Sequence, residues 1–325
     1  MPNTSSEPQA PARAETHAGE APLPAGSWPG GGSASPLRAV LESIRPYQWL
    51  KNTLVFVPVA AAHRLGEPHL LARAAEIFVA FCLCASAVYV LNDLRDAPAD
   101  RLHPHKRFRP IASGRLPERF ALILVLMLLA AAAMTVWPLG VRPAAALALY
   151  LTLMVGYTLG LKEVVLLDAF VLAAGYALRV VAGGLAVDIE PSPRLLAFCI
   201  FLFVSLALVK RYAELALLRL SDGAAAHARA YLLQDQEYIV ALGTSCGALA
   251  VLVLALYMSS ETVARLYSRS GLIWLTCVLL LYWISHMWLM AHRGRMTDDP
   301  LVFAVRDRLS LALIVLMGIT SWLAV

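Results

Sequence analysis

The chain has 325 residues, of which 59% are hydrophobic and only 15% are charged, with a formal net charge of +5. An ordinary soluble domain has about 25% charged residues, so the composition excludes a typical soluble protein and indicates a body embedded in lipid. The cations form no Lys/Arg stripe with stacking aromatic residues on a soluble domain. We therefore expect no nucleic-acid partner.

The N-terminal segment differs from the rest of the chain. Residues 1–37 are rich in Pro, Gly, Ala, Ser and Glu and show no apolar periodicity. Such a segment cannot bury enough apolar surface to offset its ordering entropy, so it predicts a disordered tail. Residues 38–325 then form a single transmembrane domain.

Apolar stretches near the ~20 residues that a helix needs to cross a bilayer recur along this domain. They predict an all-α, polytopic integral membrane protein. The expected spans are 52–65, 71–91, 119–137, 143–161, 164–187, 195–218, 238–258, 271–291 and 308–325. The first is short and the last ends at residue 325, so nine spans are expected and eight are the alternative.

Lys and Arg are distributed unequally between the loops. Fifteen lie in 93–119, 209–229 and 292–308, whereas the opposite loops carry five. Because cytoplasmic loops carry the excess of Lys and Arg, this asymmetry predicts an inner-membrane protein whose charged loops face the cytoplasm. The five cysteines lie in predicted spans without a metal-ligand spacing, which favours small core residues.

An acidic motif follows the second span. Asp93, Asp96 and Asp100 are spaced so that a helix would bring them to one face, with Asn92 beside them. Hard oxygen ligands at this density suit Mg²⁺, which prefers a few carboxylates, water and substrate phosphate oxygens. The alternative is a solvated acidic helix end. Pro98 leaves open whether Asp100 lies on the helix or in a turn.

A basic block comes next. Lys106 and Arg109 are flanked by prolines that fix the chain. A phosphate-binding role for these two residues is at least as favoured as the alternative, in which they belong to a positively charged loop that only orients the protein in the membrane. The following Ala112, Ser113 and Gly114 are compact enough for the backbone to approach an anion.

Several charges lie within or beside other spans. Asp168 and Arg179 are predicted inside the hydrocarbon, where an ionised group costs at least about 2.5 kcal/mol, so they must face a polar cavity or each other. Further polar residues fall at span ends on the side of the acidic motif, namely Lys51, Tyr157, Lys162, Lys210, Arg211 and Tyr212. Their gathering on one membrane face predicts a cytoplasm-facing active site for a phosphorylated substrate.

The sequence Asn92, Asp93, Asp96 and Asp100 matches NDxxDxxxD, the first signature of the UbiA superfamily of intramembrane prenyltransferases. The chain resembles this superfamily from Arg45 onward. The resemblance implies nine helices around a central cavity open to the cytoplasm and to lipid. It also implies a second motif, YAxxDxxDD, but here KRYAELALLRL keeps only Tyr212 and Ala213 and lacks the later aspartates.

Within the superfamily, RPYQWLKN, HPHKRFRPIASG, KRYAEL and VRDR make the chain similar to the decaprenyl-phosphate phosphoribosyltransferases. This similarity implies transfer of a 5-phosphoribosyl group from phosphoribosyl diphosphate to a polyprenyl phosphate, with Mg²⁺ as the cofactor. Asn92, Asp96 and Asp100 would hold the metal, while Asp93 would support these ligands and Asp168 would belong to the catalytic site. The phosphate-binding residues would be Lys51, Lys106, Arg109, Tyr157, Lys162, Arg179, Lys210, Arg211 and Tyr212.

Two other functions remain as alternatives. A conventional prenyltransferase would move a prenyl chain from its diphosphate to an aromatic or lipid acceptor, and it predicts a second carboxylate cluster near 212–222. A transporter or flippase would use Asp168 and Arg179 as pathway charges and predicts polar groups accessible from both sides. The sequence leaves a homo-oligomer open.

Overall fold

A computed structural model of the chain describes residues 35–103, 106–220, 231–259, 269–296 and 299–324. All elements in these ranges are helical, which confirms the all-α prediction. Residues 1–34 of the predicted tail lie outside the described residues. Its predicted boundary extends too far, because Pro36 and Leu37 already belong to the first helix.

The described elements follow one another in a simple order. They are α1 (Pro36–Ile44), the 3-10 helix η1 (Pro46–Phe56), α2 (Val57–Ala61), α3 (Pro68–Leu102), η2 (Lys106–Phe108), α4 (Glu118–Val136), η3 (Trp137–Leu139), α5 (Val141–Leu159), η4 (Leu161–Glu163), α6 (Leu167–Ala186), α7 (Pro193–Leu220), η5 (Leu233–Asp235), α8 (Gln236–Met258), α10 (Ser270–His292), α11 (Pro300–Arg306) and α12 (Arg308–Ala324). Seven of the described helices are long and apolar enough to cross a membrane, and α12 is a shorter apolar helix.

Each predicted span from 71–91 onward coincides with one of these helices, but the stretch 52–65 is not a membrane-spanning α-helix. The chain there completes η1 and then forms the five-residue α2. Pro58 has no N–H to donate, and Lys51 and Asn52 are buried against polar partners elsewhere in the protein. Local polarity and proline therefore override the apolar composition of this stretch.

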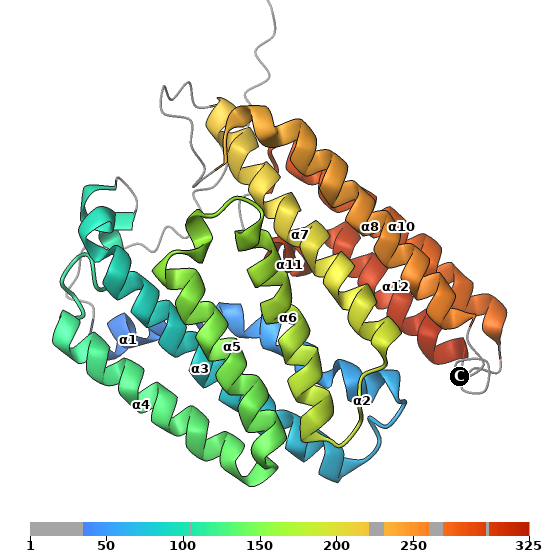
Figure 1. Cartoon of the computed structure of the whole chain (residues 1–325), viewed down its shortest axis with the longest axis horizontal. Helices are drawn as coiled ribbons and strands as arrows, with labels where there is room; N and C mark the ends of the chain where they lie inside the picture. Colours follow the sequence, from blue (N-terminus) through green and yellow to red (C-terminus); the bar gives the residue numbers. More distant parts are fainter. Residues whose placement is uncertain (1–34, 104–105, 221–230, 260–268, 297–298, 325) are drawn as a thin grey trace, which may run out of the picture. The chain divides into compact units, whose positions relative to one another are not determined.

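Helix α6 lies between two groups of helices (Figure 1). Its Val171 and Ala182 pack into a core with η1, α3 and α5, while its Ala169 and Ala173 pack into a second core with α7, α8, α10 and α12. Small side chains on several faces of one helix let neighbouring helices approach closely. Both cores therefore meet on α6.

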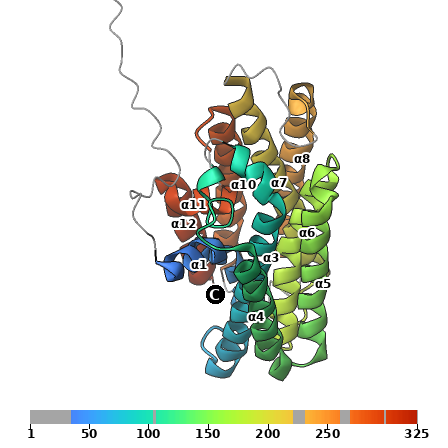
Figure 2. The ribbon, with the colours of Figure 1, turned by 90° about the vertical axis from the view of Figure 1, so that its left-hand side faces the viewer.

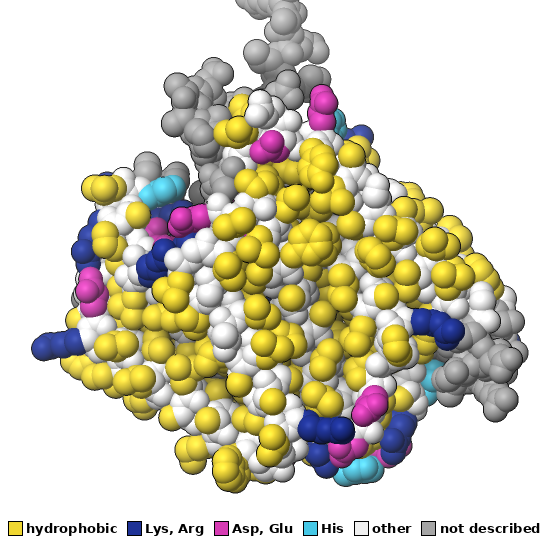
Figure 3. Space-filling view, viewed as in Figure 1, with side chains coloured by type: hydrophobic (Ala, Val, Ile, Leu, Met, Phe, Trp, Pro, Cys, Tyr) yellow, Lys and Arg dark blue, Asp and Glu magenta, His cyan; other side chains and the backbone are white. Residues whose placement is uncertain are grey.

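The long helices run side by side (Figure 2), and many of the side chains on their outer surfaces are apolar. Apolar side chains cover most of the face in Figure 3, and charged side chains gather mainly at its upper left and lower edge. Many large apolar residues are exposed, including Met134, Leu126 and Val278. An exposed apolar band with charged ends is the surface that a lipid bilayer covers.

A backbone contact places η1 against α6. A Cβ atom added at Gly183 would lie 2.0 Å from the carbonyl oxygen of Val55, so only glycine fits there. The contact fixes the segment that carries Lys51 and Asn52. The glycine is therefore part of the support of the polar residues on η1.

We expect Gly183→Ala to lower the free energy of unfolding by about 1–3 kcal/mol, because the added methyl group must displace backbone rather than a flexible side chain. Thermal unfolding of the purified protein in detergent would measure this loss. The control is Gly318→Ala in α12, where no atom lies within 4 Å of the added Cβ. Equal melting temperatures for both variants would show that η1 does not depend on this contact.

Candidate active site

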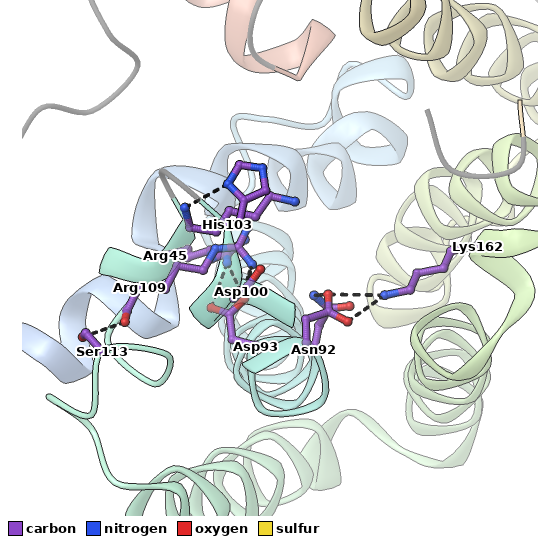
Figure 4. A network of polar contacts seen from close by, with 10 residues as sticks. Arg45, Asn92, Asp93, Asp100, His103, Arg109, Ser113 and Lys162 are labelled. Carbon is purple, nitrogen blue, oxygen red and sulfur yellow. Dashed lines mark hydrogen bonds and ion pairs between the residues drawn. The ribbon is translucent and has the colours of Figure 1, made fainter. Parts of the chain in front are cut away.

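The acidic motif lies at the C-terminal end of α3, which continues through Pro98 to Leu102. Asp100 therefore lies on the helix and not in a turn. The helix carries all three aspartates toward basic residues from other segments (Figure 4). Each carboxylate has a cationic partner, and these partners divide the motif into two ion-pair groups.

The first group contains Asp93 and Asp100. Arg45 Nη2 donates to both oxygens of Asp93, at 2.7 and 2.8 Å. Arg109 Nη1 bridges the two carboxylates, at 3.2 Å from Asp93 Oδ1 and 2.7 Å from Asp100 Oδ2. Asp93 and Asp100 are only 2% and 4% exposed, so burial strengthens the requirement for these cations.

The loop after α3 holds Arg109 in this position. His103 Nδ1 accepts a hydrogen bond from the Lys106 N–H, and the Ser113 hydroxyl donates to the Arg109 carbonyl. Gly114 closes the turn with a φ of +77°, a conformation that favours glycine. The basic block thus supplies one guanidinium to the acidic motif, while the side chain of Lys106 is exposed.

The second group contains Asp96 and Asn92. The Asn92 amide donates to Asp96 Oδ2 at 2.9 Å, and Lys162 Nζ lies 3.0 Å from Asp96 Oδ1. Lys162 comes from η4, between α5 and α6, so the structure joins residues that are distant in sequence. The side chain of Asp96 is 30% exposed, which makes it the most accessible carboxylate of the motif.

The donor set of this motif suits Mg²⁺ in kind, because carboxylate and amide oxygens are its preferred protein ligands. In the described residues, however, no three His, Cys, Asp or Glu side chains form a group that could hold a metal ion. Arg109 Nη1 donates to Asp100 Oδ2 at 2.7 Å, whereas Asn92 and Asp96 are hydrogen-bonded to each other. Asn92 and Asp96 are thus the pair that the structure already brings together.

A polar cavity of about 260 Å³ lies beside this motif, and Arg45 is part of both. The cavity is lined by Arg45, Gln48, Lys51, Tyr89, Lys210, Ala213, Glu214, Leu217, Met296 and Asp299. Lys51 Nζ lies 2.8 Å and Lys210 Nζ 3.7 Å from Asp299 Oδ2. Two predicted phosphate-binding lysines therefore meet on one carboxylate oxygen.

Asp299 is ionised in this setting. Burial alone would raise the pKa of its carboxyl group, but the charges of Lys51 and Lys210 outweigh burial and lower the pKa to about 2. A carboxyl group with a lowered pKa stabilises the fold above its unfolded pKa of about 3.9, and this stabilisation is lost as the pH falls toward 2. The carboxylate is consequently charged at neutral pH.

Asp168 and Arg211 are fully buried and form the centre of another polar network. Arg211 Nε lies 2.5 Å from Asp168 Oδ2, and its Nη2 donates to the Tyr157 hydroxyl at 3.1 Å. The Tyr231 hydroxyl donates to Asp168 Oδ1 at 2.5 Å and accepts the Leu166 N–H at 2.9 Å. Leu166 has a φ of +66°, so Tyr231 supports a strained turn that leads from η4 into α6.

Arg179 lies apart from Asp168 and from the lining of the cavity. Its guanidinium donates to Asn52 Oδ1 at 2.7 Å, to the Gly175 carbonyl at 2.7 Å and to the Tyr150 hydroxyl at 2.9 Å. The rings of Phe81, Tyr150 and Tyr176 surround it. The structure therefore places this predicted phosphate-binding residue as a link between α6 and η1.

Tyr212 likewise points to a protein partner, since its hydroxyl lies 2.8 Å from His292 Nδ1. Asp299 and Tyr231 were not among the residues predicted from the sequence. Asp299 precedes Pro300, and its side chain accepts the Leu301 N–H at the start of α11. An acidic N-cap before proline signals a helix start, whereas Tyr231 has no comparable local signal.

Long apolar helices together with a cavity lined by paired cations and carboxylates are typical of an integral membrane protein with a charged site. The chain belongs to the UbiA prenyltransferase family, whose model matches residues 53–321. The nodulation protein NoeC of Azorhizobium caulinodans is 39% identical over 279 residues, which cover 86% of this chain and 91% of that protein. The family and the seven apolar helices identify an integral membrane transferase.

Two further comparisons bear on the fold and the substrate. The decaprenyl-phosphate phosphoribosyltransferase of Mycolicibacterium smegmatis is 40% identical over 182 residues, covering 55% of this chain and 57% of that protein. The solved structure of a UbiA homolog from Archaeoglobus fulgidus bound to GPP and Mg²⁺ has a TM-score of 0.63 and 15% identity, covering 88% of this chain and 100% of that one. At this identity the likeness shows the fold alone.

Tyr231→Phe is expected to lower the free energy of unfolding by about 1–3 kcal/mol, because it leaves the Leu166 N–H and Asp168 without the hydroxyl. Thermal unfolding in detergent would measure the change. Tyr238→Phe is the matched control, since Tyr238 is 58% exposed on α8. An unchanged melting temperature for Tyr231→Phe would contradict a supporting role for its hydroxyl.

Proposed function

We propose that the protein transfers a 5-phosphoribosyl group from phosphoribosyl diphosphate to a polyprenyl phosphate, with Mg²⁺ as the cofactor. The reaction takes place where the charged ends of the helices meet, which we assign to the cytoplasmic face of the inner membrane from the distribution of Lys and Arg. The 40% identity to a decaprenyl-phosphate phosphoribosyltransferase supports the donor and the acceptor.

One observation carries the proposal. The cavity beside the acidic motif is lined by three cations, Arg45, Lys51 and Lys210, and by two carboxylates, Glu214 and Asp299. In the stretch of α7 where a conventional prenyltransferase would carry its second carboxylate cluster, the lining has one carboxylate, Glu214, followed by Leu217. A second metal site needs carboxylates, whereas phosphate groups need Lys and Arg. Two phosphorylated substrates suit this balance of charge better than one prenyl diphosphate and an uncharged acceptor.

In this mechanism, the bond between C1 of the ribose and the diphosphate breaks, and a bond from C1 to an oxygen of the acceptor phosphate forms. Asn92, Asp96 and Asp100 would hold Mg²⁺, which would neutralise the departing diphosphate. Arg109 and Lys162 already face these carboxylates and lie in position to take up phosphate oxygens. Arg45 keeps the neighbouring Asp93 fixed, so we assign Asp93 a positioning role.

No general base is required. The acceptor phosphate is anionic at neutral pH, because the second pKa of a phosphate monoester is about 6. Catalysis then consists of positioning the two substrates and stabilising the charge that moves to the leaving group. The paired cations of Arg45, Arg109 and Lys162 supply that stabilisation from three different segments of the chain.

The decisive experiment offers two donors to the purified protein in detergent. One reaction contains labelled phosphoribosyl diphosphate, a polyprenyl phosphate and Mg²⁺, and the other contains a labelled prenyl diphosphate with 4-hydroxybenzoate. We expect label from the first donor in the lipid fraction and no transfer after addition of EDTA. Product from the second reaction alone would identify a conventional prenyltransferase and contradict the proposal.

Asp96→Asn is expected to lower the rate of this transfer by about a hundredfold or more, because the amide cannot neutralise the metal that stabilises the leaving group. The control is Asp188→Asn, since the side chain of Asp188 is 73% exposed and pairs only loosely with Arg73 at 3.3 Å. Full activity of Asp96→Asn with unchanged dependence on Mg²⁺ would remove Asp96 from the metal site.

A further inference from the structure

Asp299 has an uncommon environment for a carboxylate. It is 9% exposed at the side chain, and its Oδ2 faces two ammonium groups, those of Lys51 and Lys210. Its Oδ1 accepts the Leu301 N–H at 3.2 Å. One oxygen thus belongs to the start of α11, while the other neutralises a pair of lysines inside the cavity.

The charge of the cavity is incompletely balanced. Its lining contains the cations Arg45, Lys51 and Lys210 but only the carboxylates Glu214 and Asp299. Arg45 is already held by Asp93 in a bidentate pair. Glu214 is in turn held by Arg211. Lys51 and Lys210 therefore share the charge of Asp299, and two ammonium groups offer more donors than a single carboxylate oxygen can accept.

A phosphate monoester dianion matches these two lysines better than Asp299 does. It carries two negative charges and three terminal oxygens, and lysine binds phosphate as a mobile point charge. The cavity also holds a buried acceptor, Gln48 Oε1, that has no hydrogen-bond partner among the described residues. A phosphate dianion carries no proton that it could donate to this acceptor, so Gln48 is not assigned to the phosphate.

An apolar hollow adjoins the same lysine. Lys210 and Asp299 also line a small space whose other walls are Leu172, Tyr176, Leu206, Ala207, Pro300 and Leu301, from α6, α7 and α11. This space has a volume of only about 10 Å³, the room of a single water, so it offers apolar contact to a head group at the lysines but no channel for a lipid chain. This juxtaposition favours a lipid phosphate over a sugar phosphate.

We propose that Lys51 and Lys210 form a subsite for a phosphate monoester. In the free protein the carboxylate of Asp299 occupies this subsite, and the substrate phosphate displaces it. The inference rests on the proposed function for the identity of the substrate, and it assigns the lysine pair to the lipid acceptor. Asp299 then makes the subsite specific for a doubly charged head group, because a singly charged or neutral head group would not displace the Asp299 carboxylate from the two ammonium groups.

Binding measured without turnover tests this assignment. The purified protein in detergent, at pH 8 and with EDTA, is titrated with farnesyl phosphate, with ribose 5-phosphate and with uncharged farnesol. Asp299→Asn removes the competing charge but keeps a side chain that caps helices well. We expect it to bind farnesyl phosphate about tenfold more tightly, since the interaction with one charge at ion-pair distance changes affinity by a factor of this order.

Further variants separate the site from a general effect of charge. Asp188→Asn, the same substitution at an exposed position, should leave the affinity unchanged. Lys210→Met should weaken binding of farnesyl phosphate about tenfold in an otherwise unaltered protein, and it provides the test if Asp299→Asn does not fold. Farnesol should bind all variants equally.

Unchanged or weaker binding of both phosphates to folded Asp299→Asn would overturn the inference, as would unchanged binding to Lys210→Met. Tighter binding of ribose 5-phosphate alone would overturn the assignment to the lipid acceptor. Because the titration uses neither Mg²⁺ nor a sugar donor, its result is independent of the transfer assay. Tight binding without phosphoribosyl transfer would reject the proposed reaction and retain the subsite.

Discussion

Compensation of buried charge is the constraint on which the candidate site depends. An ionised side chain in an apolar interior is strongly destabilising unless an opposite charge or several hydrogen bonds replace its hydration. Asp93 meets Arg45, Asp96 meets Lys162, Asp168 meets Arg211, and Asp299 meets Lys51. Each pair joins segments that are distant in sequence, so the charges also hold the ends of the helices together.

The support of this site extends into the apolar body. Arg179 is buried, and its guanidinium donates to Asn52, Tyr150 and the Gly175 carbonyl. Together with the close approach of Gly183 to Val55, it fixes η1 on α6. Lys51 is the neighbour of Asn52 in η1. The buried hydrogen bond between Arg179 and Asn52 therefore helps to position the lysine that lines the cavity.

The sequence predicts most of the helices and the composition of the site, because both depend on local patterns. Apolar length predicts the spans from 71–91 onward, and the spacing of Asp93 and Asp96 places them on one helix, whereas Pro98 leaves the position of Asp100 open. The stretch 52–65 has the same apolar character, yet Pro58 and the tertiary contacts of Asn52 give it a different conformation. The apolar pattern of the sequence contains no information about a contact between residues as distant as Asn52 and Arg179.

The choice of partners was equally inaccessible to the sequence. Asp168 and Arg179 share a helix, which suggested a common polar environment, but Asp168 pairs with Arg211 from α7. Which helices are neighbours depends on the packing of Ala169, Ala173 and similar small residues against both cores. Asp299 was missed because its local sequence announces the start of a helix, while its second role arises only when η1 and α7 converge on it.

A site that is neutralised internally has consequences for substrate binding. A phosphate entering the cavity does not meet free cations; it exchanges one set of ion pairs for another, and the released carboxylates need a new counter-charge. Near Asp96 and Asp100, Mg²⁺ is suited to provide that charge, because it takes carboxylate and phosphate oxygens together. Near Asp299, the cap at Leu301 retains one oxygen while the other is displaced. In the proposed reaction, the metal would thus neutralise Asp96 and Asp100, whereas the acceptor phosphate would displace an oxygen of a separate carboxylate, Asp299.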